Sequence, residues 1–492
     1  MVRAPFGRYD AGVLLGSGIY LYFNLFSLGG TPFLLGGDEQ VFWMNGLRML
    51  HGELPYRDFF EFTPPGADLV YFSAFTLLGT RVWVPNVVQL VLGITLSWLC
   101  FHIARSITKP ALAALTAALF ITLDFGKWFD ATHHWFSLLA VLAALAVLMS
   151  DGSSMRVLIC GALLGLASFF TQTRGVGAAL GIAGFLLWEG FRTKAPWRSR
   201  VERQLQLLFS FVLMWGILSS YFIFEVGISR LLYFQTTYVL QYVTDESHNL
   251  YSGERNPLRW QLRYLLVYLA IPIAYALSLW RCRNASPDTS PAHVRRIVLL
   301  VFAGLGVFVE VAQNPNSLRV YSIAAPGLIL FVWLMGGWAG QMREYAPWRK
   351  FVPALIGVGL ICLGARQIWH RNVEHAVILD LPAGRTATTA LAGEKLAWLA
   401  RHTTPGELFF QSSYQSLYLP LALRNPAFDF LDRYTSPEFV DLDIKRLQAT
   451  PVRHILWSPL DQPRFPKFEQ FLSERYRRIW TFSDQDEIWE LK

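Results

Sequence analysis

The chain has 492 residues, of which 53% are hydrophobic, 15% aromatic and only 16% charged. This composition, with a mean hydropathy of +0.34, excludes an ordinary soluble globular domain and predicts a membrane protein. The net charge of +8 does not indicate a nucleic-acid partner, because the Lys and Arg residues stand in short clusters between apolar segments and form no contiguous basic face. The four cysteines show no metal-ligand spacing and suggest no disulfide framework.

Apolar stretches alternate with polar loops along most of the chain. A membrane-spanning helix needs about 20 mostly apolar residues. The clear candidates are residues 11–28, 82–104, 133–149, 205–224, 264–280 and 320–341. Shorter or glycine-rich candidates are residues 110–123, 156–171, 175–191, 296–313 and 351–368. The sequence therefore predicts a polytopic α-helical membrane protein with about 11 transmembrane helices.

The basic residues between these stretches predict the orientation of the chain, because cytoplasmic loops carry an excess of Lys and Arg. With a cytoplasmic N terminus, every basic cluster falls on the cytoplasmic side, from Arg105 and Lys109 to Arg349 and Lys350. The external segments are then residues 29–81, 124–132, 226–262 and 314–319 and the C terminus. No small-residue cleavage site follows the first stretch, so we expect it to be retained as a helix. We expect a multi-pass protein of the bacterial inner membrane whose C terminus is periplasmic.

Two parts of the chain differ in character. In the external loop 29–81, residues 38–51 are typical of an amphipathic helix and residues 66–79 of a short apolar one. Both are too short to span a bilayer and suit the membrane interface. After residue 380 the sequence is of mixed polarity, with turn signals and short β-rich runs such as ELFFQ, HILWS and EIWEL. We therefore predict a transmembrane domain over residues 1–379 and a small periplasmic α/β domain over residues 380–492.

A pair of acids opens the most informative segment, GGDEQVFWMNGLRMLHGELPYRDFFEFTPPG, residues 36–66. Asp38 and Glu39 begin the predicted amphipathic helix next to the membrane, where acids are costly unless they are solvated or functional. From the residues alone, capping of the helix N terminus explains Asp38 as well as catalysis does. Glu39 is equally consistent with facing solvent.

The Asp-Glu pair after the first span, the helix that follows it and the run PYRDFFEF-x-PPG resemble the GT-C glycosyltransferases. The similarity is to the protein mannosyltransferase, aminoarabinose transferase and Rgt-like families. LASFFTQTRG at residues 166–175, and Arg319 and Tyr321 followed by Pro326, are also similar to segments of these families. The resemblance implies a GT-C fold and an inverting transfer of a sugar from a polyprenyl-phosphate donor to a periplasmic glycan, lipid or protein. It also implies that Asp38 is the general base and that Glu39 orients the acceptor.

The resemblance places three further acids in the active site. Asp58 and Glu61 belong to the PYRDFFEF run, and Asp130 is the best match in the second external loop, DFGKWFDATHH. We expect these three carboxylates to bind the substrate. The alternative for Asp58 is a structural ion pair with Arg57.

His133 and His134 follow Asp130 and are also candidate substrate ligands. Together with Asp124 and Asp130 they are residue types that bind divalent metals. Neighbouring residues on a helix, however, point about 100° apart and rarely bind one ion together. No cofactor is assigned, and a divalent metal remains an open alternative.

The leaving phosphate needs cationic stabilisation. Members of the resembled families often carry Lys before the Pro of the first loop, where this chain has Thr63, and in the LASFFTQTRG segment, where it has Gln172. Arg57, Arg174 and Arg319 are therefore the predicted donor-phosphate ligands, because a guanidinium group binds phosphate in bidentate fashion. Snorkelling at a helix end is the alternative for Arg319.

Two other classes of protein compete with a transferase. A lipid or glycan transporter or flippase is also polytopic, but transporters tend to place ionisable groups near the bilayer midplane. Here the acids gather on the external side. A scaffold whose C-terminal domain binds a partner would give the loop acids a structural role only. The expected partners of the transferase are a polyprenyl-phosphate-linked sugar, the acceptor and membrane lipid.

Overall fold

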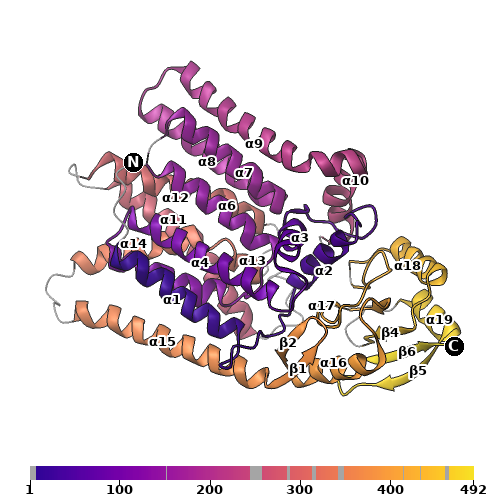
Figure 1. The fold of residues 1–492 in the computed structure, drawn as a ribbon. Helices are drawn as coiled ribbons and strands as arrows, with labels where there is room; N and C mark the ends of the chain where they lie inside the picture. Colours follow the sequence, from indigo (N-terminus) through magenta and orange to yellow (C-terminus); the bar gives the residue numbers. More distant parts are fainter. Residues whose placement is uncertain are drawn as a thin grey trace.

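Long helices run side by side through the larger part of the protein, and a smaller part built of helices and strands lies at one end of them (Figure 1). The computed structural model describes residues 7–150, 152–243, 258–284, 289–312, 317–341, 348–413, 415–432, 434–459 and 465–492. The C-terminal strands and the N-terminal end of α1 lie at opposite ends of the molecule (Figure 1).

All the apolar stretches named in the sequence fold as helices, because a helix satisfies its backbone hydrogen bonds within one segment. They are α1 (Arg8–Leu25), α4 (Val84–Arg105), α5 (Pro110–Leu119) with the π-helix η1 (Phe120–Phe125), α6 (His133–Leu148), α7 (Ser154–Phe170), α8 (Gln172–Arg192), α9 (Trp197–Val226), α11 (Leu258–Arg283), α12 (Pro291–Ala312), α14 (Ala325–Gln341) and α15 (Trp348–Glu374). Within the described residues, α4 and α9 are long and apolar enough to cross a membrane, and several other apolar helices are shorter. The number of about 11 crossings stays a prediction.

The helix α9 lies at the edge of the helical part (Figure 1) and leaves most of its apolar side chains uncovered. Leu205, Phe209 and Phe224 are 59%, 63% and 87% exposed. A surface of this kind suits contact with lipid rather than water.

Glycines allow α8 and α12 to pack backbone against backbone. A Cβ atom on Gly306 would overlap the carbonyl oxygen of Gly177 and lie 3.1 Å from Cα of Gly181. Small residues at such crossings are typical of helices that associate within a membrane. This contact fixes α12 against α8.

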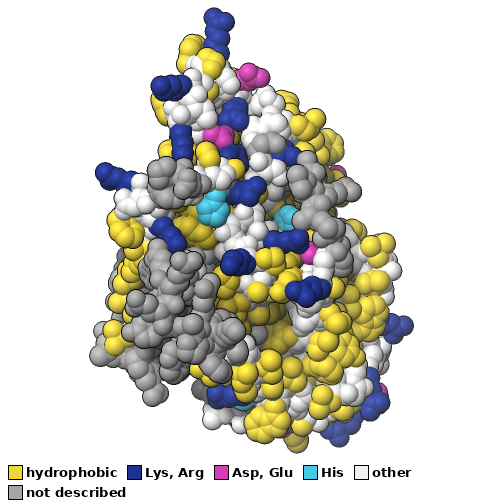
Figure 2. All heavy atoms as spheres, turned by 90° about the vertical axis from the view of Figure 1, so that its left-hand side faces the viewer, with side chains coloured by type: hydrophobic (Ala, Val, Ile, Leu, Met, Phe, Trp, Pro, Cys, Tyr) yellow, Lys and Arg dark blue, Asp and Glu magenta, His cyan; other side chains and the backbone are white. Residues whose placement is uncertain are grey.

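Basic residues gather at the helix ends farthest from the C-terminal strands. Figure 2 shows Lys and Arg side chains spread over this face. Arg296 donates to the backbone oxygens of Met149 (3.0 Å) and Ser106 (2.9 Å), and Arg295 pairs with Glu189. The ends of α4, α6 and α8 therefore meet the start of α12, as the distribution of basic residues predicts. That this end faces the cytoplasm stays a prediction.

Shorter helices lie at the opposite end. They are α2 (Glu39–Leu50), α3 (Gly66–Leu78), α10 (Ile228–Leu232), the π-helix η2 (Tyr233–Val243) and α13 (Ser317–Tyr321). The two interfacial helices predicted in loop 29–81 are thus present as α2 and α3. Their backbones pack closely, since a Cβ atom on Gly46 would lie 2.8 Å from the backbone nitrogen of Phe72.

The C-terminal part contains two sheets. The hairpin of β1 (Val377–Leu381) and β2 (Gly384–Thr388) is antiparallel. The second sheet has the order β3 (Phe409–Gln411), β4 (His454–Trp457), β6 (Glu487–Leu491) and β5 (Tyr476–Thr481), with only β3 and β4 parallel. The helices are α16 (Ala390–His402), α17 (Tyr418–Leu421), α18 (Pro437–Ala449) and α19 (Pro466–Arg475). The predicted domain boundary after residue 379 falls within β1, shortly after α15 ends.

The segment before Asp38 is attached to the C-terminal part by backbone hydrogen bonds. The Leu34 N–H donates to the oxygen of Ala387, and the Ala387 N–H donates to the oxygen of Pro32, both at 2.8 Å. The segment extends the hairpin like a further strand, because Phe33 forms a parallel bridge with Ala387. This attachment brings Asp38 close to the C-terminal strands.

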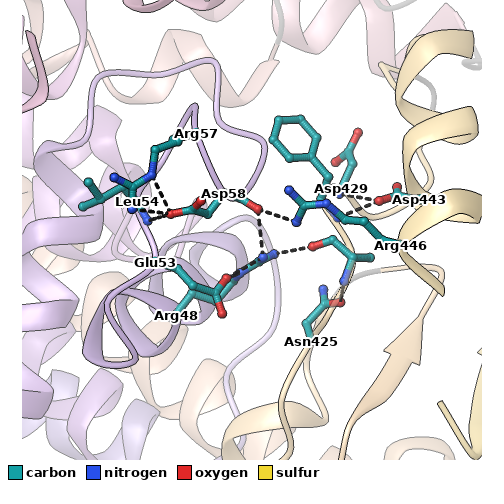
Figure 3. A network of polar contacts seen from close by, with 11 residues as sticks. Arg48, Glu53, Leu54, Arg57, Asp58, Asn425, Asp429, Asp443 and Arg446 are labelled. Atoms are coloured by element: carbon teal, nitrogen blue, oxygen red, sulfur yellow. Dashed lines mark hydrogen bonds and ion pairs between the residues drawn. The ribbon is translucent and has the colours of Figure 1, made fainter. Parts of the chain in front are cut away.

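Arginines join the external loop to the C-terminal part (Figure 3). Arg446 on α18 donates to the backbone oxygen of Asp58 at 2.7 Å, and Arg48 on α2 donates to the same oxygen at 3.2 Å. Arg48 also donates to the oxygen of Ala427 at 2.8 Å and pairs with Glu53 at 2.6 Å. The contact therefore depends on the shape of the loop backbone more than on the loop side chains.

Candidate active site

A cavity of about 570 Å³ lies between the loop that precedes α2, the loop that follows η1 and the C-terminal part. Its polar lining residues are Asp38, Gln40, Lys127, Asp130, Lys395, Gln411, Ser413, Ser416 and Asp486. The cavity thus joins three segments that are far apart in the sequence. It contains one predicted active-site acid from each of two external loops, Asp38 from the first and Asp130 from the second.

Asp38 is exposed and stands at the position before the first residue of α2. Its side chain makes no capping hydrogen bond to the helix, which argues against capping as its role. The preceding residue, Gly37, has a φ of +105°, and a Cβ atom there would lie 3.4 Å from Oδ2 of Asp130. Glycine at this position therefore permits both the backbone turn and the approach of the second acid.

Glu39 is fully buried, so the alternative that it faces solvent is wrong. Its Oε2 accepts a hydrogen bond from the backbone N–H of Ala131 at 3.0 Å. Burial raises the pKa of Glu39 to about 8, although the Ala131 N–H and Arg371 oppose the shift. Glu39 therefore holds the start of α2 against the loop that carries Asp130, and its carboxyl group is largely protonated at neutral pH.

Asp130 is buried at the wall of the cavity. Its Oδ2 accepts a hydrogen bond from Nε1 of Trp128 at 2.9 Å. Burial raises the pKa of Asp130 well above its usual range, and the charges of Asp38 and Glu39 add to the shift.

Several polar residues of the cavity were not assigned a role from the sequence. Lys127 follows η1 and is exposed, and Lys395 on α16 pairs with both Asp484 and Asp486. Lys127 stands in the same loop as Asp130, so its position in the sequence could have predicted that it belongs to the site. Lys395 and Asp486 lie more than 250 residues away from Asp130 and belong to no motif.

His133 and His134 lie at the start of α6, beside Arg174. Nδ1 of His133 lies 2.8 Å from Oγ1 of Thr171, and an amino nitrogen of Arg174 lies 3.3 Å from Nδ1 of His134. Arg174 is fully buried and pairs with Glu310 of α12 at 3.0 Å. Glu310 was missed in the sequence, although an acid within an apolar helix is itself a functional signal.

Arg319 lies on α13 close to this group. Ser322 accepts a hydrogen bond from Arg174 at 2.9 Å, and its own hydroxyl donates to the backbone oxygen of Arg319 at 2.9 Å. The three segments that carry His134, Arg174 and Arg319 are therefore brought together, and the substrate contacts expected of these residues stay a prediction.

Glu61 belongs to a second buried acidic group. It accepts hydrogen bonds from the hydroxyl of Thr63 at 2.9 Å and from Asn45 at 2.8 Å, and Asn45 also donates to Asp68 at 3.1 Å. Burial raises the pKa of Glu61 to about 7 and that of Asp68 well above its usual range. Thr63, which replaces the expected Lys, is thus engaged within the loop.

Arg57 and Asp58 form the ion pair that was the alternative to substrate binding. Their side chains are 2.8 Å apart, and Arg57 also lies 3.5 Å from Glu225. Neither residue lines the cavity around Asp38. Figure 3 shows them at the junction with the C-terminal part.

The part of the chain that the structure describes contains no clear metal site. In the described ranges, no group of three or more His, Cys, Asp or Glu side chains is arranged to hold a metal ion. The rings of His133 and His134 lie with their centroids 3.9 Å apart and their planes tilted by 34°.

Known structures share this architecture. ArnT from Cupriavidus metallidurans bound to undecaprenyl phosphate is 14% identical, covers 98% of this chain and 97% of its own, and has a TM-score of 0.61. ArnT in the apo state has the same identity and TM-score, with 97% of each chain covered. The Archaeoglobus fulgidus oligosaccharyltransferase tethered with an acceptor peptide is 11% identical with a TM-score of 0.51, and covers 92% of this chain and 69% of its own. No protein-family model and no curated protein matches the sequence.

The chain therefore shares the fold of ArnT and of the archaeal oligosaccharyltransferase, in agreement with the fold expected from its sequence. A mostly helical part carries a small C-terminal part with sheets, and this arrangement is confirmed. At 11–14% identity the likeness establishes the fold, and the activity has to be argued from the site.

Proposed function

We propose that the protein is an integral-membrane, inverting glycosyltransferase that moves a sugar from a polyprenyl-phosphate donor to an acceptor hydroxyl. The observation that supports this most directly is the cavity in which the exposed carboxylate of Asp38 lies beside Asp130 and Lys127. The known structures with this fold include one bound to undecaprenyl phosphate and an oligosaccharyltransferase. A cavity with an exposed acid suits a reaction in which a hydroxyl must lose a proton.

In the proposed reaction, Asp38 accepts the proton of the acceptor hydroxyl while the hydroxyl oxygen attacks the anomeric carbon of the donor sugar. The bond between that carbon and the phosphate oxygen breaks, and the polyprenyl phosphate leaves with the electron pair. One displacement inverts the configuration of the anomeric carbon. Lys127 adds a positive charge to the cavity, which favours the developing charge on the phosphate.

The other acids have different proposed roles. Glu39 keeps Asp38 in place through its hydrogen bond to Ala131, and Asp130 binds the sugar. Glu61 shapes the loop that follows α2 and joins it to that helix, since it accepts hydrogen bonds from Thr63 in the loop and from Asn45 on α2. His133 and His134 lie beside Arg174 and are proposed to contact the substrate.

The orientation proposed for the chain places this cavity on the periplasmic side of the inner membrane. The basic face shown in Figure 2 lies at the other end of the helices and would be cytoplasmic. The acceptor is a glycan, lipid or protein on the periplasmic side. Residues 380–492 form one wall of the cavity through Lys395, Gln411, Ser413, Ser416 and Asp486, and are proposed to help select the acceptor.

The first test compares wild type with Asp38→Asn in membranes supplied with radiolabelled polyprenyl-phosphate sugars. We expect the transfer rate of Asp38→Asn to fall by at least about 100-fold, the usual contribution of a general base. Asp380→Asn is the matched control, because Asp380 is 85% exposed on β1 and does not line the cavity. It should transfer sugar at the wild-type rate.

Equal amounts of folded protein are checked by the elution profile and thermal unfolding of each purified variant. If Asp38→Asn transfers sugar as fast as Asp380→Asn, Asp38 is not the base. If wild type transfers sugar from none of the donors and instead moves labelled lipid across vesicles, the transporter alternative replaces the proposal.

A further inference from the structure

Glu310 is an acid inside the apolar helix α12, and it pairs with Arg174 of α8. Oε2 of Glu310 lies 3.0 Å from Nε of Arg174, and Oε1 lies 3.4 Å from a terminal nitrogen of the same guanidinium group. The side chain of Arg174 is fully buried, and that of Glu310 is only 8% exposed. Taking two charges out of water is costly, so stability alone does not explain a buried pair at this position.

The guanidinium group of Arg174 has an acceptor for each of its five N–H bonds. Besides Glu310, the acceptors are the backbone oxygen of His134 at 2.5 Å, Oγ of Ser137 at 3.3 Å, Oγ of Ser322 at 2.9 Å and Nδ1 of His134 at 3.3 Å. These acceptors belong to α6, α12 and the turn between α13 and α14. Arg174 therefore joins three segments to α8, and no N–H of its guanidinium group is left for a phosphate.

The contact with Arg174 also sets the tautomer of His134. A guanidinium group donates hydrogen bonds and cannot accept them, so Nδ1 of His134 is the acceptor and carries no proton. The proton of the neutral ring is then on Nε2. Because the backbone oxygen of His134 accepts from Arg174 as well, both the ring and the backbone of this residue are fixed at the start of α6.

His134 connects this group to the cavity of the candidate active site. Its ring centre lies 4.6 Å from that of Trp128, which lines the cavity. Nε1 of Trp128 in turn donates to Oδ2 of Asp130 at 2.9 Å, and Asp130 lines the same cavity. The contacts therefore run without a break from Glu310 to the carboxyl group of Asp130.

We propose that Arg174 and Glu310 are positioning residues for the carboxyl group of Asp130. They act through His134 and Trp128 rather than by touching the substrate. The inference rests on the proposed function, in which Asp130 binds the sugar. A binding group that is misplaced by a small distance weakens a reaction even when the change lies far from the reacting atoms.

A second ion pair joins the same two helices near their other ends and supplies a matched control. Glu189 of α8 pairs with Arg295 of α12, and the side chain of Glu189 is 12% exposed. Neither residue lines the cavity. Glu189 also pairs with Arg203 of α9, so Glu189→Gln disturbs helix packing at least as much as Glu310→Gln does. The control differs from Glu310→Gln in having no path of contacts to Asp130 among those described.

The first test follows amide hydrogen exchange of the full-length protein in lipid nanodiscs. Peptides that cover residues 126–136 report on the loop of Asp130, where the Ala131 N–H is bound by Glu39. We expect Glu310→Gln to speed exchange in these peptides by about tenfold, the effect of losing one hydrogen bond to a charged group, and Glu189→Gln to leave it unchanged. Equal exchange rates in the two variants would overturn the inference.

The second test separates positioning from a general loss of packing. Trp128→Phe keeps an aromatic ring beside His134 but removes the N–H that binds Asp130. With radiolabelled polyprenyl-phosphate sugar as donor, we expect Glu310→Gln and Trp128→Phe each to raise the KM for the donor by about tenfold and to change kcat less. The double variant should show no larger rise than either single one, because both changes break the same series of contacts.

Two kinetic results would contradict the inference. Multiplied effects in the double variant would show that Glu310 does not act through Trp128, and an equal rise of KM in Glu189→Gln would show a general effect of packing. If Glu310→Gln does not fold, Ser322→Ala takes its place in both tests, since it removes one acceptor of Arg174 and should give a smaller change of the same kind.

Failure of the inference and failure of the proposed function give different results. If wild type transfers sugar but Glu310→Gln and Glu189→Gln behave alike, only the inference fails. If wild type transfers no sugar from any donor, the proposed function fails, and the exchange rates of residues 126–136 still decide whether Glu310 holds the loop of Asp130.

Discussion

Glu39 combines complete burial with a single hydrogen bond from the Ala131 N–H. Its carboxyl group has an ordinary pKa of 4.5, and burial raises this value to about 8 in the folded protein. Between these two pH values the folded protein keeps a proton that the unfolded chain releases. The free energy of unfolding therefore falls as the pH rises from about 4.5 to about 8.

Replacement of Glu39 by Gln should remove this contribution, because Gln carries no charge and retains an oxygen for the Ala131 N–H. We expect the unfolding temperature of Glu39→Gln to fall less than that of wild type between about pH 5 and about pH 9. Thermal unfolding of purified protein in detergent measures the difference. Glu469→Gln, an exposed change on α19, is the control, and an identical decline in Glu39→Gln and in this control would contradict the argument.

The pairing of Asp38 with Asp130 was accessible from the sequence, because both acids stand in loops predicted to lie on the same side of the membrane. The burial of Glu39 was not accessible. An Asp-Glu pair at the start of a helix predicts two solvated acids. Glu39 is buried because the loop that carries Asp130 packs against the start of α2. Helix propensity depends on the residues near a helix end, so it cannot predict packing against a loop some 90 residues away.

At the scale of elements, the crossing of α8 and α12 depends on glycine. Gly306→Leu would place a side chain where the backbone of Gly177 lies, so the two helices would have to separate. We expect a loss of about 1–3 kcal/mol in stability, the usual cost of overpacking. Thermal or denaturant unfolding in detergent measures it.

Gly216→Leu on α9 is the matched control, because a Cβ atom there would meet no atom within 4 Å. This substitution should change stability by no more than about 0.5 kcal/mol in either direction, as surface substitutions usually do. If both variants unfold alike, the close packing of α8 on α12 does not stabilise the protein.

The long helices could be predicted because runs of apolar residues of the required length leave the backbone few alternatives. The two described π-helices, η1 and η2, could not be predicted from the sequence. Residues 226–262 read as an external loop, yet α10 and η2 form within them, and Phe234 and Tyr238 of η2 pack against Phe439 of the C-terminal part. A tertiary contact, and no local pattern, supports this helix.

At the scale of the whole molecule, Arg446 connects the C-terminal part to the loop that carries Asp58. Its guanidinium group donates to the Asp58 oxygen at 2.7 Å and lies 5.3 Å from the ring centre of Phe428. Arg446→Ala leaves that carbonyl oxygen without this donor. We expect a loss of about 1–3 kcal/mol in stability and a lower transfer rate, because the two walls of the cavity are then less firmly joined.

Limited proteolysis and thermal unfolding check this expectation, with faster cleavage between the two parts as the supporting result. Lys467→Ala is the control, because Lys467 is 68% exposed and pairs with Asp441 on the neighbouring helix α18. Equal proteolysis of Arg446→Ala and Lys467→Ala would show that the Arg446 contact does not hold the two parts together.

The division into a helical and a mixed part could be predicted, since apolar runs give way to alternating short ones after residue 380. The arrangement of the cavity could not. Lys395 and Asp486 belong to no motif in the sequence, and tertiary contacts such as the pairing of residues 32–34 with the β1–β2 hairpin bring them to the site.

This attachment has a consequence for biosynthesis. Asp38 is synthesised more than 350 residues before Lys395, Ser416 and Asp486. A chain that is interrupted before them carries the proposed base without the opposite wall of its cavity. We therefore expect transferase activity only after these residues have been made and residues 32–34 have paired with the hairpin.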